Sequence, residues 1–150
     1  MKLSDLAELD LAYAPPYSSA NDPLQMAAFA AQNDLSGYSP FMSPGEAAAL
    51  AAFGTDTSTM GSPYFLDVRT FGEYCRAHVT GSVNIPLDEL RDRISQLPRE
   101  KRILIFSVNG FEGHIASRIL RQNGFERLAY VTGGMKSMRL FGGFKEVEGE

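Results

Sequence analysis

A polar loop at residues 107–113 combines residue types and a spacing that could bind an anion. The apolar run before it, Ile103–Phe106, predicts a buried strand, and the pattern after it predicts a helix over 111–122. A strand, a short glycine-containing turn and a helix together aim backbone N–H groups at one point, where an anion can bind. We therefore predict an anion-binding loop made of Ser107, Val108, Asn109, Gly110, Phe111, Glu112 and Gly113.

Ser107 stands at the end of the predicted strand, where this arrangement usually carries a nucleophile. A serine hydroxyl attacks only when an adjacent general base takes its proton. The candidate base is His114, which lies seven positions along on the outgoing helix and is not aimed back at the strand end. A Ser–His hydrolase is therefore disfavoured.

The charged residues near the other strand ends fit structural roles better than catalytic ones. Asp67, Arg69 and Glu73 are expected to form an ion pair that fixes a strand-to-helix turn. Lys136 and Arg139 follow a double glycine, and they either border the binding crevice or are ordinary surface charges.

Cysteine and histidine are too scarce for metal or disulfide chemistry. With Cys75 as the single cysteine, no internal disulfide and no multi-cysteine metal site can form. Cys75 is expected within a helix, without a context that stabilises a thiolate, so we predict a structural role. The two histidines, His78 and His114, are too few for a convincing site, and we predict no metal.

The composition describes a globular protein with one core. Hydrophobic residues make up 44% of the chain and charged residues 21%, and no apolar run approaches the length of a membrane span. No signal segment opens the chain, so a cytoplasmic location is expected. The net charge of −4 gives no sign of nucleic-acid binding.

Residues 42–142 alternate between apolar runs and helical patterns, which predicts an α/β fold. Single helices between strands imply a parallel sheet with right-handed crossovers, which binds ligands at the carboxyl ends of its strands. We expect strands at 64–68, 82–85, 102–107 and 128–131, and helices at 45–53 (capped by Ser43), 70–78, 87–97, 111–122 and 135–140. In the helix at 87–97, the stripe expected to face the core is Leu87, Leu90, Ile94 and Leu97.

Residues 1–35 differ from the rest of the chain. Residues 1–60 carry seven acids against Lys2 alone, a net charge of −6, whereas residues 61–150 carry a net charge of +2. We predict two short helices, Ser4–Ala12 capped by Ser4 and a second opened by Asp22 and Pro23. Two such helices cannot enclose a core, so they need another surface. A linker at 36–41 follows them, and a tail at 143–150 ends the chain.

The stretch FLDVRTFGEYCRAHVTGSVNIPLDELRDRI resembles the rhodanese family in the order and spacing of its motifs, and the resemblance extends over about residues 42–142. It implies a rhodanese-like parallel sheet flanked by helices, with His78 as the structural histidine of the family's turn. Sulfurtransferases of this family carry a Cys-x-x-Gly-x-Arg loop in which the cysteine holds sulfur as a persulfide. The matching residues here are Ser107, Gly110 and Glu112.

Both departures from the family's loop act against sulfur transfer. Serine cannot form a persulfide, and Glu112 places a negative charge beside a site meant for anions. We therefore predict no catalytic residue as the chain stands, and a silent domain that serves in interaction or anion sensing. The alternative is an active sulfurtransferase whose cysteine has been changed to Ser107. A phosphatase of the same fold is rejected, because neither Glu112 nor Gly113 supplies the arginine that such enzymes need.

The stretch DLAELDLAYAPPYSSANDPLQMAAFAAQN is similar to the end of the dimerisation domain in flavin-dependent pyridine nucleotide–disulfide oxidoreductases of the coenzyme A-disulfide reductase type. Tyr13 matches the tyrosine that this tail brings to the partner's redox cysteine. The resemblance implies a homodimer, or a flavoenzyme partner, bound through residues 1–35. FAD, NADH and coenzyme A would belong to reductase domains absent from this chain, so we predict no cofactor here; no Gly-x-Gly-x-x-Gly motif occurs.

Overall fold

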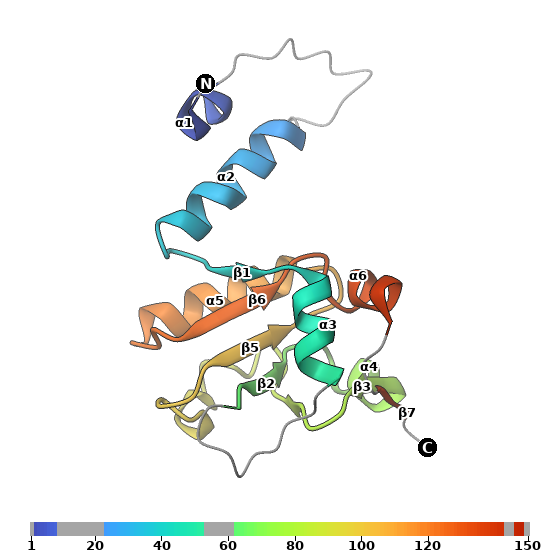
Figure 1. Cartoon of the computed structure of the whole chain (residues 1–150). Helices are drawn as coiled ribbons and strands as arrows, with labels where there is room; N and C mark the ends of the chain where they lie inside the picture. The colour runs from blue at the N-terminus through green and yellow to red at the C-terminus, as the bar shows by residue number, and fades with distance from the viewer. Residues whose placement is uncertain (1, 9–22, 53–61, 143–145, 149–150) are drawn as a thin grey trace. The chain divides into compact units, whose positions relative to one another are not determined.

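The computed structural model of the chain describes residues 2–8, 23–52, 62–142 and 146–148 (Figure 1). The chain forms two compact units, residues 1–40 and 41–150. The predicted Tyr13 position and the loop at 53–61 lie outside the described residues.

The first unit contains α1 (Leu3–Ala7) and α2 (Pro23–Leu35), which contact each other. The prediction that Ser4 caps the first helix is wrong. Asp5 accepts a hydrogen bond from the Lys2 backbone N–H at 2.7 Å, so the cap lies two residues earlier and Ser4 sits inside the helix. The predicted start of the second helix at Pro23 is confirmed.

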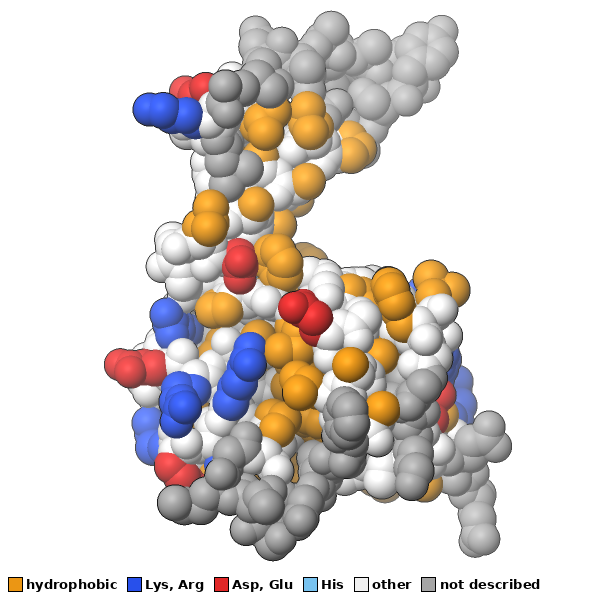
Figure 2. Space-filling model, in the orientation of Figure 1, with side chains coloured by type: hydrophobic (Ala, Val, Ile, Leu, Met, Phe, Trp, Pro, Cys, Tyr) orange, Lys and Arg blue, Asp and Glu red, His pale blue; other side chains and the backbone are white. Residues whose placement is uncertain are grey.

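The surface of α2 is apolar over much of its length. Ala28 is buried, but the larger side chains Leu24, Met26, Phe29 and Leu35 are exposed. Figure 2 shows the hydrophobic side chains along this helix. Because apolar surface gains free energy on leaving water, this helix presents a surface suited to burial.

The second unit is built on a parallel sheet of five strands in the order β1-β6-β5-β2-β4, which confirms the predicted α/β fold. The strands are β1 (Phe41–Met42), β2 (Tyr64–Asp67), β4 (Val83–Asn84), β5 (Ile103–Phe106) and β6 (Leu128–Val131). All of β5 and β6 is buried, as expected for central strands covered on both faces.

Side chains alternate between the two faces of this sheet and build two cores. Leu66, Ile105 and Tyr130 pack with α5 (Phe111–Gln122) on one face. Leu104, Phe106 and their neighbours pack on the other face with α3 (Pro44–Ala52) and α6 (Gly134–Phe141). Figure 1 shows α5 on one side of the sheet and α3 on the other. The helices predicted at 45–53, 111–122 and 135–140 are thus confirmed within one or two residues.

The helix predicted at 87–97 is wrong, although its apolar stripe is right. Residues 87–93 form successive turns, and a short 3₁₀ helix, η1 (Ile94–Gln96), follows. The Leu87 N–H donates to the Val68 carbonyl at 3.1 Å, which ties the segment to β2, and Glu89 bonds back to Pro86 rather than across a full α-turn. Leu90 and Leu97 are buried nonetheless, while Leu87 and Ile94 pack against the core.

The helix predicted at 70–78 ends early, and the predicted tail contains a strand. α4 runs over Phe71–Arg76 and β3 over Ala77–Val79, so His78 lies in a strand. β3 pairs antiparallel with β7 (Glu146–Glu148). The strand β1 was also missed, because two residues are too few to show a periodic pattern.

Substitution of Leu120 tests the core between α5 and the sheet. Leu120→Ala should lower the free energy of unfolding by about 2–5 kcal/mol, because it leaves a cavity under a fully buried side chain. Leu140, which is 86% exposed, is the matched control, and Leu140→Ala should cost less than about 0.5 kcal/mol. Urea unfolding followed by circular dichroism measures both values. Equal losses in the two variants would contradict the assignment of the core.

Candidate functional site

A cavity of about 420 Å³ lies at the carboxyl ends of β2, β4 and β5, where the topology predicts a ligand. Its lining comes from the ends of these strands and from α5, and it includes Val68, Arg69, Thr70, Glu73, Pro86, Leu87, Asp88, Arg91, Val108, Glu112, Ile115 and Ile119. The predicted site residues Arg69, Glu73, Val108 and Glu112 therefore meet at one cavity.

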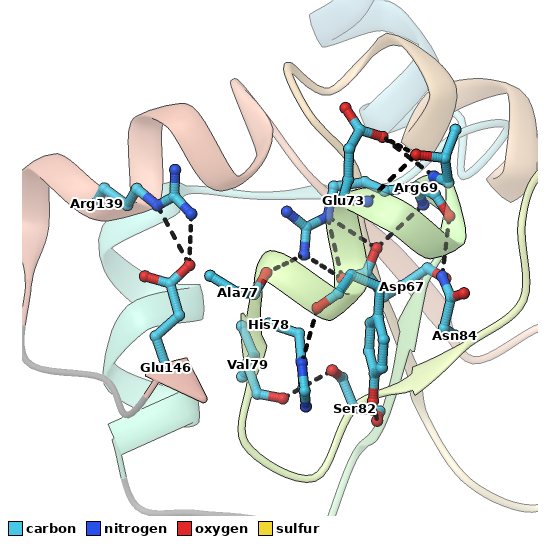
Figure 3. A network of polar contacts seen from close by, with 12 residues as sticks. Asp67, Arg69, Glu73, Ala77, His78, Val79, Ser82, Asn84, Arg139 and Glu146 are labelled. Atoms are coloured by element: carbon cyan, nitrogen blue, oxygen red, sulfur yellow. Dashed lines mark hydrogen bonds and ion pairs between the residues drawn. The ribbon is translucent and has the colours of Figure 1, made fainter. Parts of the chain in front are cut away.

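A buried ion pair joins Asp67 to Arg69, and Arg69 lines the cavity (Figure 3). Arg69 Nη2 donates to Asp67 Oδ2 at 2.6 Å, and Arg69 Nε donates to Oδ1 and Oδ2 at 3.0 and 3.1 Å. Arg69 Nη2 also donates to the Ala77 carbonyl at 2.8 Å, which ties the end of β2 to the end of α4. Because both partners are buried, this bidentate ion pair holds the turn in one conformation.

Glu73 is not part of that ion pair, although the sequence grouped the three residues. Its carboxylate accepts hydrogen bonds from the backbone N–H and the hydroxyl of Thr70, at 3.1 and 2.8 Å. Thr70 Oγ1 in turn accepts from the Glu73 N–H at 3.4 Å. This reciprocal pattern caps α4 and satisfies donors at its first turn.

Asn84 is a positioning residue that the sequence analysis did not single out. Its side-chain amide donates to the Asp67 carbonyl at 3.0 Å and to the Arg69 carbonyl at 2.9 Å (Figure 3). These bonds hold the end of β2 against β4. An asparagine directly before Ile-Pro was the available signal, but its partners depend on strand order.

His78 lies behind this turn. Its ring stacks on Tyr74 with centroids 3.9 Å apart, and its Nδ1 lies 2.9 Å from the Tyr74 carbonyl oxygen. The Tyr74 hydroxyl donates to the Ser82 carbonyl at 2.6 Å, and burial raises the pKa of Tyr74. The arrangement packs α4 against the turn that follows β3.

In the loop at 107–113, two backbone N–H groups donate to side chains of the same loop. Ser107 is fully buried, and its Oγ accepts a hydrogen bond from the Gly110 N–H at 3.0 Å. Asn109 Oδ1 accepts from the Phe111 N–H at 3.1 Å. These two backbone N–H groups are therefore already paired with side chains of the loop.

The first turn of α6 fixes the loop from the other side. The N–H groups of Met135 and Lys136 donate to the carbonyls of Ser107 and Val108, at 2.8 and 3.2 Å. Gly134 makes this approach feasible: it has a φ of +58°, and a Cβ there would overlap the Ser107 carbonyl oxygen.

Glu112 stands on the first turn of α5 and lines the cavity. Its Oε2 is buried and has no hydrogen-bond partner among the described residues. Most buried polar atoms of native proteins have a partner, so this oxygen is an exception that calls for a physical reason.

His114 lies on α5 beside Tyr130 of β6. Its ring packs edge-on against Tyr130, with centroids 5.7 Å apart, while Ser107 Oγ accepts from the Gly110 N–H. Partial burial, aided by Arg118, lowers the pKa of His114. That a Ser–His pair is disfavoured stays a prediction from the sequence.

Lys136 and Arg139 border a second hollow beside the loop, together with Arg69, Glu73, Arg76, Val108 and Met135. Arg139 is paired with Glu146 of β7 at 2.6 Å (Figure 3), which raises the pKa of Arg139. Cys75 is a free, partly buried thiol on α4.

Within the described ranges, no cluster of three His, Cys, Asp or Glu side chains could hold a metal ion. No helix in those ranges is long and apolar enough to span a bilayer.

A comparison with protein families matches residues 46–140 to the rhodanese-like domain. The chain belongs to this family. The match takes in the rhodanese-like domain's cavity, its 107–113 loop and the Asp67–Arg69 turn.

Two solved structures resemble a longer part of the chain than the family match at residues 46–140. The reduced Bacillus anthracis CoADR-RHD is 38% identical and covers 92% of this chain, with a TM-score of 0.75. The NAD-dependent persulfide reductase of A. fulgidus is 36% identical over 90% of this chain, with a TM-score of 0.66. The chain corresponds to only 23% and 22% of those two proteins.

A curated relative, YrkF of Bacillus subtilis (strain 168), is 34% identical over 88 residues. These residues are 59% of this chain and 48% of YrkF, so the chain spans about half of that relative's length.

Asp67 tests the scaffold of the rhodanese-like site. Asp67→Ala should cost about 3–5 kcal/mol of unfolding free energy, because it leaves the Arg69 guanidinium buried without a counter-charge. Glu89→Ala, which breaks the exposed Glu89–Arg93 pair, should cost less than about 0.5 kcal/mol. Thermal and urea unfolding of both variants give the comparison. A small loss for Asp67→Ala would show that the pair does not hold the turn.

Proposed function

We propose that this rhodanese-like domain does not transfer sulfur and acts instead as a binding domain of an oxidoreductase assembly. The observation that carries the proposal is the state of Ser107. By the resemblance to the family, Ser107 occupies the position of the sulfur-carrying cysteine. The side chain is fully buried, and its Oγ accepts a hydrogen bond from the Gly110 N–H.

The chemistry of serine supports this proposal. A thiol with an ordinary pKa near 8.5 is readily ionised by a loop of N–H donors, and thiolate sulfur is a strong nucleophile. A serine hydroxyl has no comparable ionised fraction near neutral pH and needs a base, but His114 packs on Tyr130. An oxygen nucleophile also cannot carry sulfur as a persulfide.

Glu112 supports the proposal from a second direction. It stands where the family's loop has an arginine that helps to bind the anion. A negative charge about 4 Å from an anion opposes binding by roughly 1–4 kcal/mol, depending on screening. Two changes of this kind in one loop favour a natural loss of sulfur transfer over a single replaced cysteine.

The assembly is inferred from the first 40 residues. The likeness to CoADR-RHD covers 92% of the chain, which is more than residues 41–150 alone supply. It therefore includes much of the first unit, which the sequence likens to the dimerisation tail of such reductases. We infer that residues 1–35 hold two copies together, or bind a flavoenzyme, and that FAD and the nicotinamide cofactor belong to the partner domains.

Sulfur transfer from thiosulfate to cyanide tests the catalytic half of the proposal. The chain should show no turnover above a heat-denatured sample. Ser107→Cys should restore little, whereas Ser107→Cys with Glu112→Arg should be faster by about tenfold or more, the equivalent of 1.4 kcal/mol of anion binding. Ser107→Cys with Glu126→Arg makes the same charge change at an exposed site and is the control.

Turnover by the unaltered chain that disappears in Cys75→Ala would contradict the proposal. If Ser107→Cys alone matches the variant that also carries Glu112→Arg, the charge of Glu112 does not explain the loss. In that case the active-sulfurtransferase alternative, with a single replaced cysteine, is favoured.

Sedimentation of three chains tests the assembly. The full chain should form a dimer, because the exposed apolar side chains of α2 gain about 1.5–3 kcal/mol each when fully buried. A chain starting at Gly37 should be a monomer. The full chain with Leu24, Met26 and Phe29 changed to Ser keeps the length and should also be a monomer. The proposal would be contradicted by a full chain that stays monomeric and also fails to co-sediment with an added coenzyme A-disulfide reductase, or by a dimer that forms without residues 1–36.

A further inference from the structure

The 420 Å³ cavity has a lining that suits a different ligand from a sulfur-donating anion. Its volume lies within the range of small-molecule sites, roughly 300–1,000 Å³. Half of its twelve lining residues are apolar, and they come from three segments of the chain: Val68, Pro86, Leu87, Val108, Ile115 and Ile119. These walls favour a ligand with a hydrocarbon part.

Glu112, on the wall of the cavity, has an acceptor atom that lacks a donor among the described residues. Glu112 Oε2 is buried without a hydrogen-bond partner in the described part of the chain. A buried polar atom left unsatisfied costs about 1–3 kcal/mol, and more when it is charged. If the Glu112 side chain turns toward the cavity, a ligand that brings an N–H donor and a positive charge to its carboxylate would recover that free energy.

The arginines of the cavity do not meet this need. Arg69 is committed to Asp67 and to the Ala77 carbonyl. Arg91 makes no ion pair with Glu112 within 4.0 Å among the described contacts. Asp88 adds a further negative charge to the lining. With Arg69 neutralised by Asp67, acids outnumber the remaining cation.

We propose that the cavity binds a small organic cation, a primary ammonium on a short hydrocarbon chain. Glu112 accepts hydrogen bonds from the ammonium group, and Leu87, Ile115 and Ile119 cover the chain. The inference deepens the proposed function and rests on it in one respect, namely that an anionic sulfur donor no longer occupies this cavity.

Calorimetric titration of the full chain with n-pentylammonium chloride tests the proposal, with sodium pentanoate and 1-pentanol as probes of equal chain length. The ammonium should bind saturably and at least about tenfold more tightly than either probe, as expected for one charge-assisted hydrogen bond. Glu112→Gln keeps the shape of the side chain and should raise the Kd by about tenfold. Glu126→Gln, at an exposed acid outside the cavity, should leave the Kd unchanged.

Three results would overturn the inference: pentanoate binding as tightly as the ammonium, no saturable heat with any probe, or an unchanged Kd in Glu112→Gln. Backbone amide shifts confined to the cavity lining check that the ammonium binds there, and shifts elsewhere would equally overturn it. A thiosulfate–cyanide assay on the same sample separates the two proposals. Sulfur transfer together with ammonium binding refutes only the proposed function, and absence of both refutes only the cation site.

Discussion

The contact between Asp67 and Arg69 is the constraint on which the rest of the site depends. The two side chains pair with each other directly after β2, and Arg69 also donates to the Ala77 carbonyl at the end of α4. The backbone carbonyls of Asp67 and Arg69 accept hydrogen bonds from the Asn84 side chain. A buried charge without a partner would be expensive, so the turn adopts the one geometry that pairs it. The Val68 carbonyl then accepts from Leu87, which positions the segment that closes the cavity.

The backbone contacts that support the 107–113 loop do not depend on which side chain stands at position 107. α6 holds the carbonyls of Ser107 and Val108 through backbone N–H groups, and Gly134 allows the approach, so none of these contacts needs a cysteine. Within the loop, Ser107 and Asn109 accept from N–H groups at Gly110 and Phe111. The fold and the reaction are therefore separable here, as they are in other folds that serve several functions.

Local patterns in the sequence were sufficient for β2, β5, β6 and α5, because the strands are continuous apolar runs between polar turns and α5 has an apolar face with the helical period. They failed at β1, β7 and the turns at 87–93, where partners distant in sequence decide the conformation. The site shows the same division. Ser107 and the Asp67–Arg69 pair follow from strand ends and charge, whereas the bonds of Asn84 depend on β4 lying beside β2, and that of Asn109 depends on the folded path of the loop.

Position 112 shows how such a loop can change its ligand at little cost to the fold. A carboxylate in the first turn of a helix is favoured by the helix dipole by about 0.3–1 kcal/mol, whereas an arginine there is disfavoured. The resemblance to the family implies that its arginine is kept there for the anion, against helix stability. Under the proposed loss of sulfur transfer that anion is no longer needed, and helix stability alone would favour an acid at this position. The remaining cost is the Glu112 Oε2, which is buried without a hydrogen-bond partner among the described residues.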